Sequence, residues 1–247
     1  IFSPTFLIKQ TLSWRNSLTQ RKKLLYGGII SIAVFFLFIF YVLRAENHSI
    51  GPLQEESLRS DLILPMDSVL LNRAQLMKAM EEHLKTSSED IDPRGIKTIA
   101  LVGIGGSGKT TLARYYARQH KASVVAEVDA ETNEGLSDSF ERLAKILSTT
   151  EEDKKSLRKI QDIGFVKERD KQILLFVKEK LKKSPNWLLI YDNVKNFKDI
   201  HEYFPYDSRA WGRGKIIVIT RDKNIQNNNY ISSMIEVTEL TPQEKLD

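Results

Sequence analysis

The sequence predicts an α/β protein with a parallel five-stranded sheet, helices on both faces of that sheet, and a single transmembrane helix ahead of it. Three observations lead to this prediction. Short, continuously apolar runs alternate with segments of helical periodicity, which is typical of parallel strands buried on both faces. A glycine-rich loop joins the first of these runs to a helix. Near the N-terminus, Leu24 to Leu43 are twenty consecutive residues without a charge.

The N-terminal part of the chain is divided by this apolar run. Residues 1–23 form a basic segment, residues 24–43 the run itself, and residues 44–68 a polar linker. Twenty helical residues rise about 30 Å, which matches the hydrocarbon core of a bilayer. A signal peptide has a shorter apolar region, and a buried core helix seldom needs so long a run. We therefore predict that the chain contacts the membrane through residues 24–43.

The folded domain is expected to occupy residues 69–247. Its first helix is indicated by Asn72 as an N-cap, followed by apolar residues at helical spacing. These residues are Leu76, Met77, Met80 and Leu84. At the other end, Thr241 and Pro242 have the pattern of a helix start. Because the chain stops soon afterwards, we expect the domain to be incomplete at its C-terminus.

The loop between the first strand and the following helix carries the clearest chemical signal. The strand is predicted over Ile96 to Val102, and the loop reads Gly103-Ile104-Gly105-Gly106-Ser107-Gly108-Lys109-Thr110. This fits the phosphate-binding pattern G-x-x-x-x-G-K-[ST], in which glycines let successive backbone N–H groups point into one concavity. Lys109 is predicted to reach the β- and γ-phosphates of a nucleotide, and the Thr110 hydroxyl to bind Mg²⁺. A glycine-rich turn that matches by chance would lack the flanking strand and helix.

Four further apolar runs predict the remaining strands. They are Ala122 to Asp129, Trp187 to Asp192, Lys215 to Thr220 and Met234 to Val237. Between them, helical periodicity predicts one helix around Leu136 to Leu147 and another from Val166 to Leu181. Residues 148–162 are rich in charge, and we expect them to form a solvated excursion.

Residues at the ends of two of these strands are candidates for the chemistry. Asp192 ends a buried strand one helix–strand–helix unit after the loop, where phosphate-loop proteins place the aspartate that organises Mg²⁺. Asn193 follows it and accepts no proton, so we expect slow hydrolysis. Arg221 follows the next strand at the edge where open α/β sheets bind ligands, and a guanidinium there would distinguish ATP from ADP. The alternative is a surface arginine that pairs with Asp222.

Composition limits the partners and the compartment. Residues 1–50 hold six basic residues and one acidic residue, which accounts for the whole net charge of +5. The rest of the chain is balanced and indicates no nucleic-acid partner. The absence of cysteine excludes a disulfide scaffold and a cysteine zinc site. The basic residues before the apolar run favour a cytosolic N-terminus and place the domain outside. An ATP site needs the cytosol, however, and we place the domain there with this conflict open.

Five segments resemble, in order and spacing, the NB-ARC nucleotide-binding domain of STAND signal-transduction ATPases. They are GIGGSGKTTLARYYA, VVAEVDAETNEGLSDSFERLA, NWLLIYDNV, WGRGKIIVITRD and IEVTELTPQEKLD. The resemblance covers residues 62 to 247 and is greatest to bacterial members, which often carry tetratricopeptide repeats beyond the ATPase. It implies a P-loop NTPase sheet of the additional-strand type, in which the strand before Arg221 lies between the strands of the loop and of Asp192. It also implies a repeat sensor domain C-terminal to this chain.

The resemblance assigns roles to matching positions. The residues that it implies contact ATP or ADP are Leu71, Arg73, Gly103, Ile104, Gly105, Gly106, Ser107, Gly108, Lys109, Thr110, Thr111 and Arg221. Lys109, Asp192 and Arg221 are expected to act in hydrolysis, and Thr110 and Asp192 to hold Mg²⁺. Ile219 departs from the family's usual threonine, and Asn193 from its frequent second acid. The family's later Gly-x-Pro motif and winged-helix histidine would lie beyond Asp247.

The sequence thus predicts a membrane-anchored ATP/ADP switch with slow hydrolysis that self-associates when ATP is bound and controls signalling. One alternative is a turnover ATPase such as a motor or a small-molecule kinase, which a high steady-state ATPase rate would indicate. The other is a membrane scaffold that binds nucleotide only structurally, which nucleotide-independent assembly would indicate.

Overall fold

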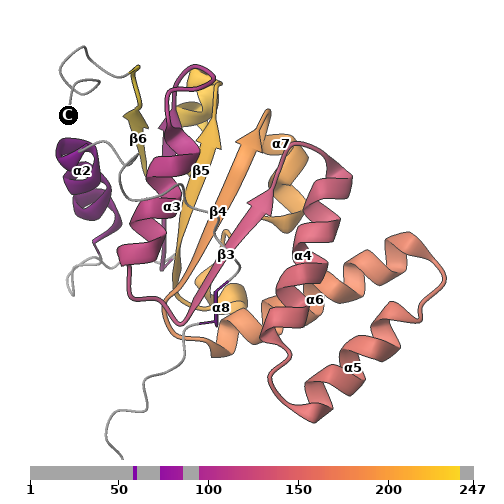
Figure 1. Ribbon diagram of the computed structural model, residues 1–247. Helices are drawn as coiled ribbons and strands as arrows, with labels where there is room; N and C mark the ends of the chain where they lie inside the picture. The colour runs from indigo at the N-terminus through magenta and orange to yellow at the C-terminus, as the bar shows by residue number, and fades with distance from the viewer. Residues whose placement is uncertain (1–57, 60–72, 86–94, 240–247) are drawn as a thin grey trace, which may run out of the picture. The chain divides into compact units, whose positions relative to one another are not determined.

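The computed structural model describes residues 58–59, 73–85 and 95–239, in which a parallel sheet lies between two layers of helices (Figure 1). The strands are β1 (Leu58–Arg59), β2 (Ile96–Val102), β3 (Val124–Asp129), β4 (Trp187–Val194), β5 (Gly214–Thr220) and β6 (Ser233–Glu236). Their order across the sheet is β1-β3-β4-β5-β2-β6, and every neighbouring pair is parallel. The five longer strands are those expected from the sequence, and β5 lies between β2 and β4 as predicted. The two-residue β1 extends the sheet beyond β3.

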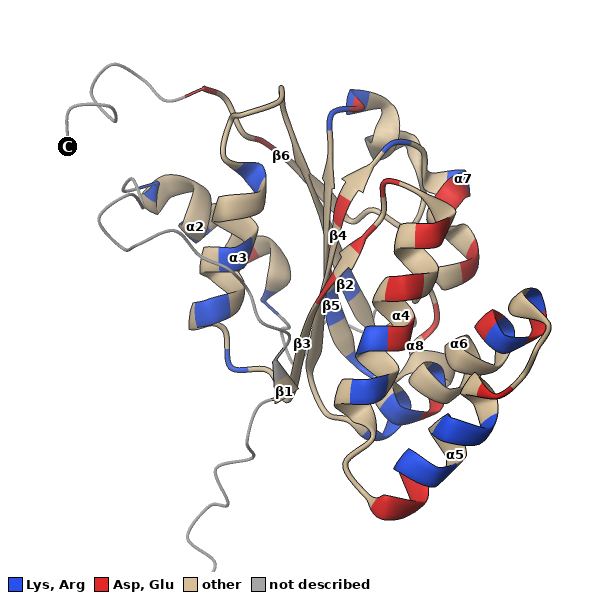
Figure 2. Ribbon diagram, turned by 45° about the vertical axis from the view of Figure 1, so that its right-hand side comes forward, with Lys and Arg blue, Asp and Glu red and all other residues tan. Residues whose placement is uncertain are grey.

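Helices cover both faces of the sheet. α2 (Ala74–Leu84) and α3 (Lys109–Gln119) lie on one side, and the helices from α4 to α8 lie on the other (Figure 2). The latter are α4 (Asn133–Leu147), α5 (Glu151–Gln161), α6 (Val166–Lys183), α7 (Phe197–Ile200) and α8 (Ser208–Trp211), with the short 3₁₀ helices η2 (His201–Tyr203) and η3 (Lys223–Asn227). The two short helices α7 and α8 were not predicted, because four residues are too few to show helical periodicity.

Two apolar cores follow from the alternation of side chains along the strands. In β4, Leu188 and Ile190 pack in the cluster beneath α2 and α3, whereas Leu189 and Tyr191 pack in the cluster beneath α4 and α6. Successive side chains of a strand point to opposite faces, so a strand covered on both faces needs apolar residues at nearly every position. This explains why the strands appear in the sequence as continuous apolar runs.

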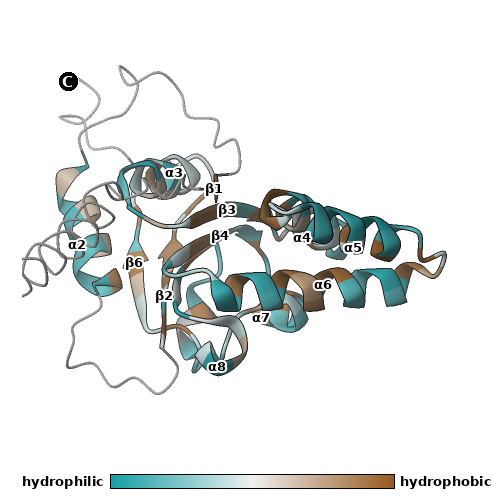
Figure 3. Cartoon of the chain, turned by 90° about the horizontal axis from the view of Figure 1, so that it is seen from below, coloured by the Kyte–Doolittle hydropathy of each residue, from teal (hydrophilic) through white to brown (hydrophobic). Residues whose placement is uncertain are grey.

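Residues 148–162, expected to form a solvated excursion, contribute the helix α5, most of whose side chains are exposed. Thr150 caps the helix by accepting a hydrogen bond from the Asp153 N–H, and Leu157 is buried. Lys180 of α6 forms an ion pair with Asp153, and the two helices lie side by side (Figure 3). The sequence did not predict this helix, because its apolar contacts come from only two residues, the buried Leu157 and the partly buried Ile160, among charged ones.

Several predicted features lie at or beyond the limits of the described residues. The first helix begins at Ala74 with Arg73 at its N-cap position, and Asn72 lies outside the described residues. The same holds for Leu71, for the predicted helix start at Thr241, and for residues 1–23, 24–43 and 44–57. Among the helices that the structure describes, none is both long and apolar enough to cross a bilayer.

Candidate nucleotide-binding site

The glycine-rich loop connects the end of β2 to the start of α3, at the carboxyl edge of the sheet (Figure 1). Gly106 and Gly108 have φ angles of +79° and +86°, in the left-handed region that favours glycine. Gly108 is the N-cap residue of α3, so the loop feeds directly into the positive end of that helix. A loop of this shape presents backbone N–H groups to an anion.

The side chain of Lys109 folds into the loop. Its Nζ donates to the carbonyl oxygens of Gly103 and Ile104 at 2.9 and 2.6 Å and lies 3.4 Å from Ser107 Oγ. The residue is only 7% exposed, and this burial lowers the pKa of its ammonium group. The positive charge of Arg221 lowers that pKa further, whereas Asp192 raises it. A phosphate bound here would therefore face a poorly hydrated cation, whose attraction to an anion is greater than in water.

Thr110 and Asp192 meet across α3 and β4. Thr110 Oγ1 donates to the two carboxylate oxygens of Asp192 at 3.1 and 3.2 Å. Burial raises the pKa of Asp192, and the hydrogen bonds from Thr110 and from the Asn193 N–H, at 2.9 Å, oppose that shift. A hydroxyl and a carboxylate are both hard oxygen ligands, which suit Mg²⁺. The structure thus brings together the two residues that the sequence assigned to the metal.

Arg221 lies over the loop. A side-chain Cβ built on Gly105 would stand 3.1 Å from an Nη atom of Arg221 and 3.2 Å from its Cζ. The guanidinium therefore lies against the backbone of the loop, and a side chain at position 105 would push it aside. Asp222, the alternative partner considered from the sequence, instead caps η3 by accepting from the Asn224 N–H. Of the remaining predicted positions, Ser107 is buried and Thr111 is partly exposed, whereas Ile104, at 56%, Gly105, Gly106 and Gly108 are exposed.

Arg73 connects the loop to the chain that leaves β6. One Nη donates to the carbonyl oxygen of Ser107 at 3.1 Å, and the other donates to that of Thr238 at 3.0 Å. The residue predicted to contact nucleotide therefore lies beside the loop and holds its backbone. The contact with Thr238 was not predictable from sequence spacing, because the two residues are far apart in the chain.

The end of β6 also packs against the start of the loop. The Val237 N–H donates to the carbonyl oxygen of Val102 at 2.7 Å, and a Cβ on Gly103 would lie 2.3 Å from the Val237 carbonyl oxygen. Gly103 is thus required by a close backbone approach as well as by the shape of the loop.

Replacing Gly103 with alanine is expected to lower the free energy of unfolding by about 1–3 kcal/mol, because the added methyl group overlaps a backbone oxygen that cannot rotate away. Urea denaturation without nucleotide measures this change. Gly164→Ala is the matched control, since a Cβ there meets no atom within 4 Å and its expected effect is within about 0.5 kcal/mol. Equal stabilities for the two variants would show that the contact between the loop and β6 is not tight.

A further polar pair near the site was missed from the sequence. Arg114 of α3 donates to both carboxylate oxygens of Glu127 in β3, at 2.7 and 2.6 Å. The available signal was the glutamate itself, which stands inside an otherwise apolar strand and so needs a partner.

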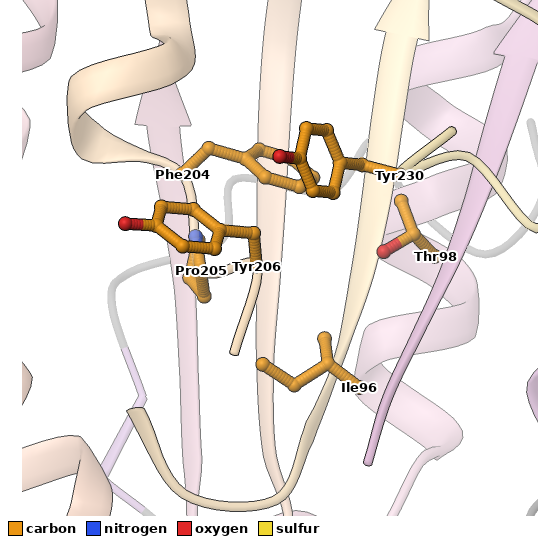
Figure 4. A pocket seen from close by; sticks show the side chains of 6 residues that line it. All are labelled: Ile96, Thr98, Phe204, Pro205, Tyr206 and Tyr230. Atoms are coloured by element: carbon orange, nitrogen blue, oxygen red, sulfur yellow. The ribbon is translucent and has the colours of Figure 1, made fainter. Parts of the chain in front are cut away.

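A pocket of different character lies at the other end of β2. It is lined by Ile96, Thr98, Phe204, Pro205, Tyr206 and Tyr230 (Figure 4). Beside it, the ring of Tyr230 contacts those of Phe204 and Tyr206. None of the predicted nucleotide-contacting residues lines this pocket, so it belongs to the aromatic packing of the sheet face rather than to the loop.

A comparison with protein-family models matches residues 73–247 to the family described as the NB-ARC domain. The chain belongs to the NB-ARC family. The matched residues begin at Arg73 and include the loop, Asp192 and Arg221. No significant match is found among curated proteins.

Solved structures similar to this NB-ARC chain include three distant ones. The STAND protein with a tetratricopeptide repeat sensor, PH0952 from Pyrococcus horikoshii, has 18% identity and a TM-score of 0.43, covering 78% of this chain and 26% of that one. The Aeropyrum pernix ORC2 protein has 14% identity and a TM-score of 0.42, covering 75% and 52%. PCH-2 from C. elegans has 14% identity and a TM-score of 0.34, covering 79% and 49%. The chain therefore spans about half or less of each of these proteins.

Proposed function

We propose that this NB-ARC chain is an ATP/ADP-dependent molecular switch that hydrolyses ATP slowly and controls signalling through nucleotide-dependent self-association. The observation that carries the proposal is the convergence of Lys109, the Thr110–Asp192 pair and Arg221 around one glycine-rich loop at the start of α3. Together they offer a cationic cradle for phosphates beside a pair of oxygen ligands for Mg²⁺.

Each residue has a distinct role in the proposed complex. The loop N–H groups and Lys109 bind the phosphates, and Thr110 and Asp192 hold Mg²⁺, which when bound neutralises charge on the phosphate oxygens. Arg221 reaches the loop from β5 and provides a second cation on the phosphate side. A switch requires only that ATP and ADP bind two conformations with different affinities, and Arg221 supplies a group whose contacts depend on the terminal phosphate.

Slow hydrolysis follows from the residue after Asp192. Asn193 is exposed at the carboxyl edge of the sheet, and its amide can orient a water molecule but cannot take its proton. A site without a positioned general base lacks a contribution of about 10²- to 10⁴-fold to the rate. Long residence of ATP suits a protein whose output is a conformational state, and it does not suit a motor or a kinase.

The proposal includes the cellular setting. The apolar run at residues 24–43 anchors the chain in a membrane as a single span, the nucleotide-binding domain lies in the cytosol, and a repeat sensor domain follows outside this chain. The apolar run supports the membrane anchor. The requirement for ATP supports a cytosolic domain, and the resemblance to bacterial NB-ARC proteins supports the repeat sensor domain.

The proposal is tested with the full chain. We expect the chain to stay with the membrane fraction during carbonate extraction and, after detergent solubilisation, to bind both ATP and ADP by calorimetry. Sedimentation should then show larger assemblies with ATP and Mg²⁺ than with ADP. A chain that stays in the supernatant contradicts the anchor, and assembly that is the same with either nucleotide favours a scaffold over a switch.

A further inference from the structure

The ion pair between Arg114 and Glu127 lies on the same side of the sheet as the proposed Mg²⁺ ligands. Its geometry is bidentate, and the two side chains are 27% and 22% exposed. A bidentate pair fixes direction as well as distance, because a planar guanidinium must match the plane of the carboxylate. Such a pair is a geometric constraint on α3, independent of the apolar residues beneath the helix.

The pair is in register with the contact between Thr110 and Asp192. Thr110 and Arg114 are four residues apart on α3, so their side chains lie on one face in successive turns. Asp129 of β3 is the register partner of Asp192 in β4, and Glu127 lies two residues before it, on the same face of β3. Successive turns of α3 therefore contact neighbouring strands at Asp192 and at Glu127. Two such contacts, added to the buried apolar residues of α3, constrain the rotation of the helix about its axis more tightly than either contact alone.

The charges of the pair also act on the proposed metal site. Glu127 raises the pKa of Asp192 and Arg114 lowers it, so both are close enough to influence that carboxylate. Further charged neighbours are Asp129, the register partner of Asp192, and Lys109 of α3, whose pKa is in turn raised by Asp192. Because Arg114 donates to both oxygens of Glu127, the glutamate is held away from any cation beside Asp192.

We propose that Arg114 is a positioning residue for Mg²⁺–nucleotide, acting through Glu127 to keep Thr110 aligned with Asp192 and to keep a second carboxylate out of the metal site. This inference rests on the proposed nucleotide-binding function. Arg114 itself touches neither the phosphates nor the metal in this arrangement. Its loss therefore affects the Mg²⁺-dependent part of ATP binding, and it leaves binding of ADP without metal nearly unchanged.

The test compares nucleotide affinities with and without Mg²⁺ for the full chain. For the wild type, the ratio of ATP affinity in Mg²⁺ to that in EDTA defines the metal-dependent gain. Arg114→Gln is expected to reduce this gain about tenfold, the lower end of the roughly 10- to 100-fold effects of residues that orient metal ligands. ADP affinity in EDTA should change less than about twofold. Arg114→Lys keeps the charge but not the bidentate geometry, so it should restore only part of the gain.

Lys180→Gln is the matched control, because Lys180 and Asp153 form a similarly buried ion pair between α5 and α6, away from the loop. It tests whether the loss of any partly buried ion pair changes nucleotide binding through stability alone. An unchanged metal-dependent gain in Arg114→Gln, or an equal loss in Lys180→Gln, would overturn the positioning role. If the wild type itself shows no nucleotide binding or no metal-dependent gain, the proposed function fails instead.

Discussion

Lys109→Ala is expected to reduce the affinity for both ATP and ADP about a hundredfold or more while the domain remains folded. The ammonium group is the buried cation of the loop, and hydrogen bonds to charged groups contribute roughly 1.5–3 kcal/mol each. The loss of two phosphate contacts of that size amounts to about two to four orders of magnitude in affinity. The fold should persist, because the partners of Lys109 Nζ are loop atoms rather than core side chains.

Calorimetry on folded protein measures this loss, with circular dichroism as the check on folding. Lys215→Ala is the matched control, since Lys215 is also partly buried, and its burial also lowers its pKa, but it stands at the start of β5, away from the loop. The nucleotide affinity of the Lys215→Ala variant should equal that of the wild type. Undiminished binding in Lys109→Ala would mean that the glycine-rich loop is not the phosphate site.

Asn193→Asp is expected to speed single-turnover hydrolysis of ATP by at least about tenfold. A correctly positioned general base contributes about 10²- to 10⁴-fold, and an introduced carboxylate captures part of that. The backbone should accept the change, because Asn193 has a φ angle of +61°, in the left-handed region where asparagine and aspartate are both enriched. The wild type should turn over well below the roughly 1–100 s⁻¹ of kinases.

The controls for this experiment separate the base from the metal ligand. Asn186→Asp makes the same substitution at another residue with positive φ, just before β4 and at the opposite edge of the sheet, and should leave the rate unchanged. Asp192→Ala should impair Mg²⁺-dependent ATP binding as well as hydrolysis. Fast hydrolysis by the wild type that Asn193→Asp does not alter would place the base elsewhere and would contradict the switch.

The sequence was most informative where local pattern and global fold agree. The run Ile96 to Val102 matches β2 residue for residue, because a strand covered on both faces is marked by continuous apolar character. Likewise, the loop and Asp192 were placed correctly relative to one another, since the carboxyl ends of parallel strands share one edge of the sheet. Each pattern is carried by residues close together in the chain, and the topology of the parallel sheet then brings the loop and Asp192 to the same edge.

The parts that could not be predicted depend on contacts between distant residues. Nothing near Arg73 in the sequence indicates that it joins Ser107 to Thr238. The sequence gives Arg114 no feature that distinguishes it from other residues on a helix surface. Its contact with Glu127 becomes visible only when β3 lies beside α3 in the structure. In α5, a single buried leucine among charged residues gives no apolar stripe for periodicity to detect. The core strands were therefore predictable, whereas polar contacts that belong to no sequence motif, such as those of Arg73 and Arg114, required the structure.

The position of β2 in the sheet has a consequence for the order of synthesis and folding. Both strands that pair with β2 come late in the chain, since Ile96 pairs with Gly214 and Ile99 with Ser233. At a translation rate of roughly 5–20 residues per second, β2 and its phosphate loop are synthesised on the order of ten seconds before β5 or β6. During that interval the apolar strand has two open edges, which favour wrong pairing. Arg221 reaches the loop only once β5 is in place, so the nucleotide site that we propose is completed at the end of this interval and not before it.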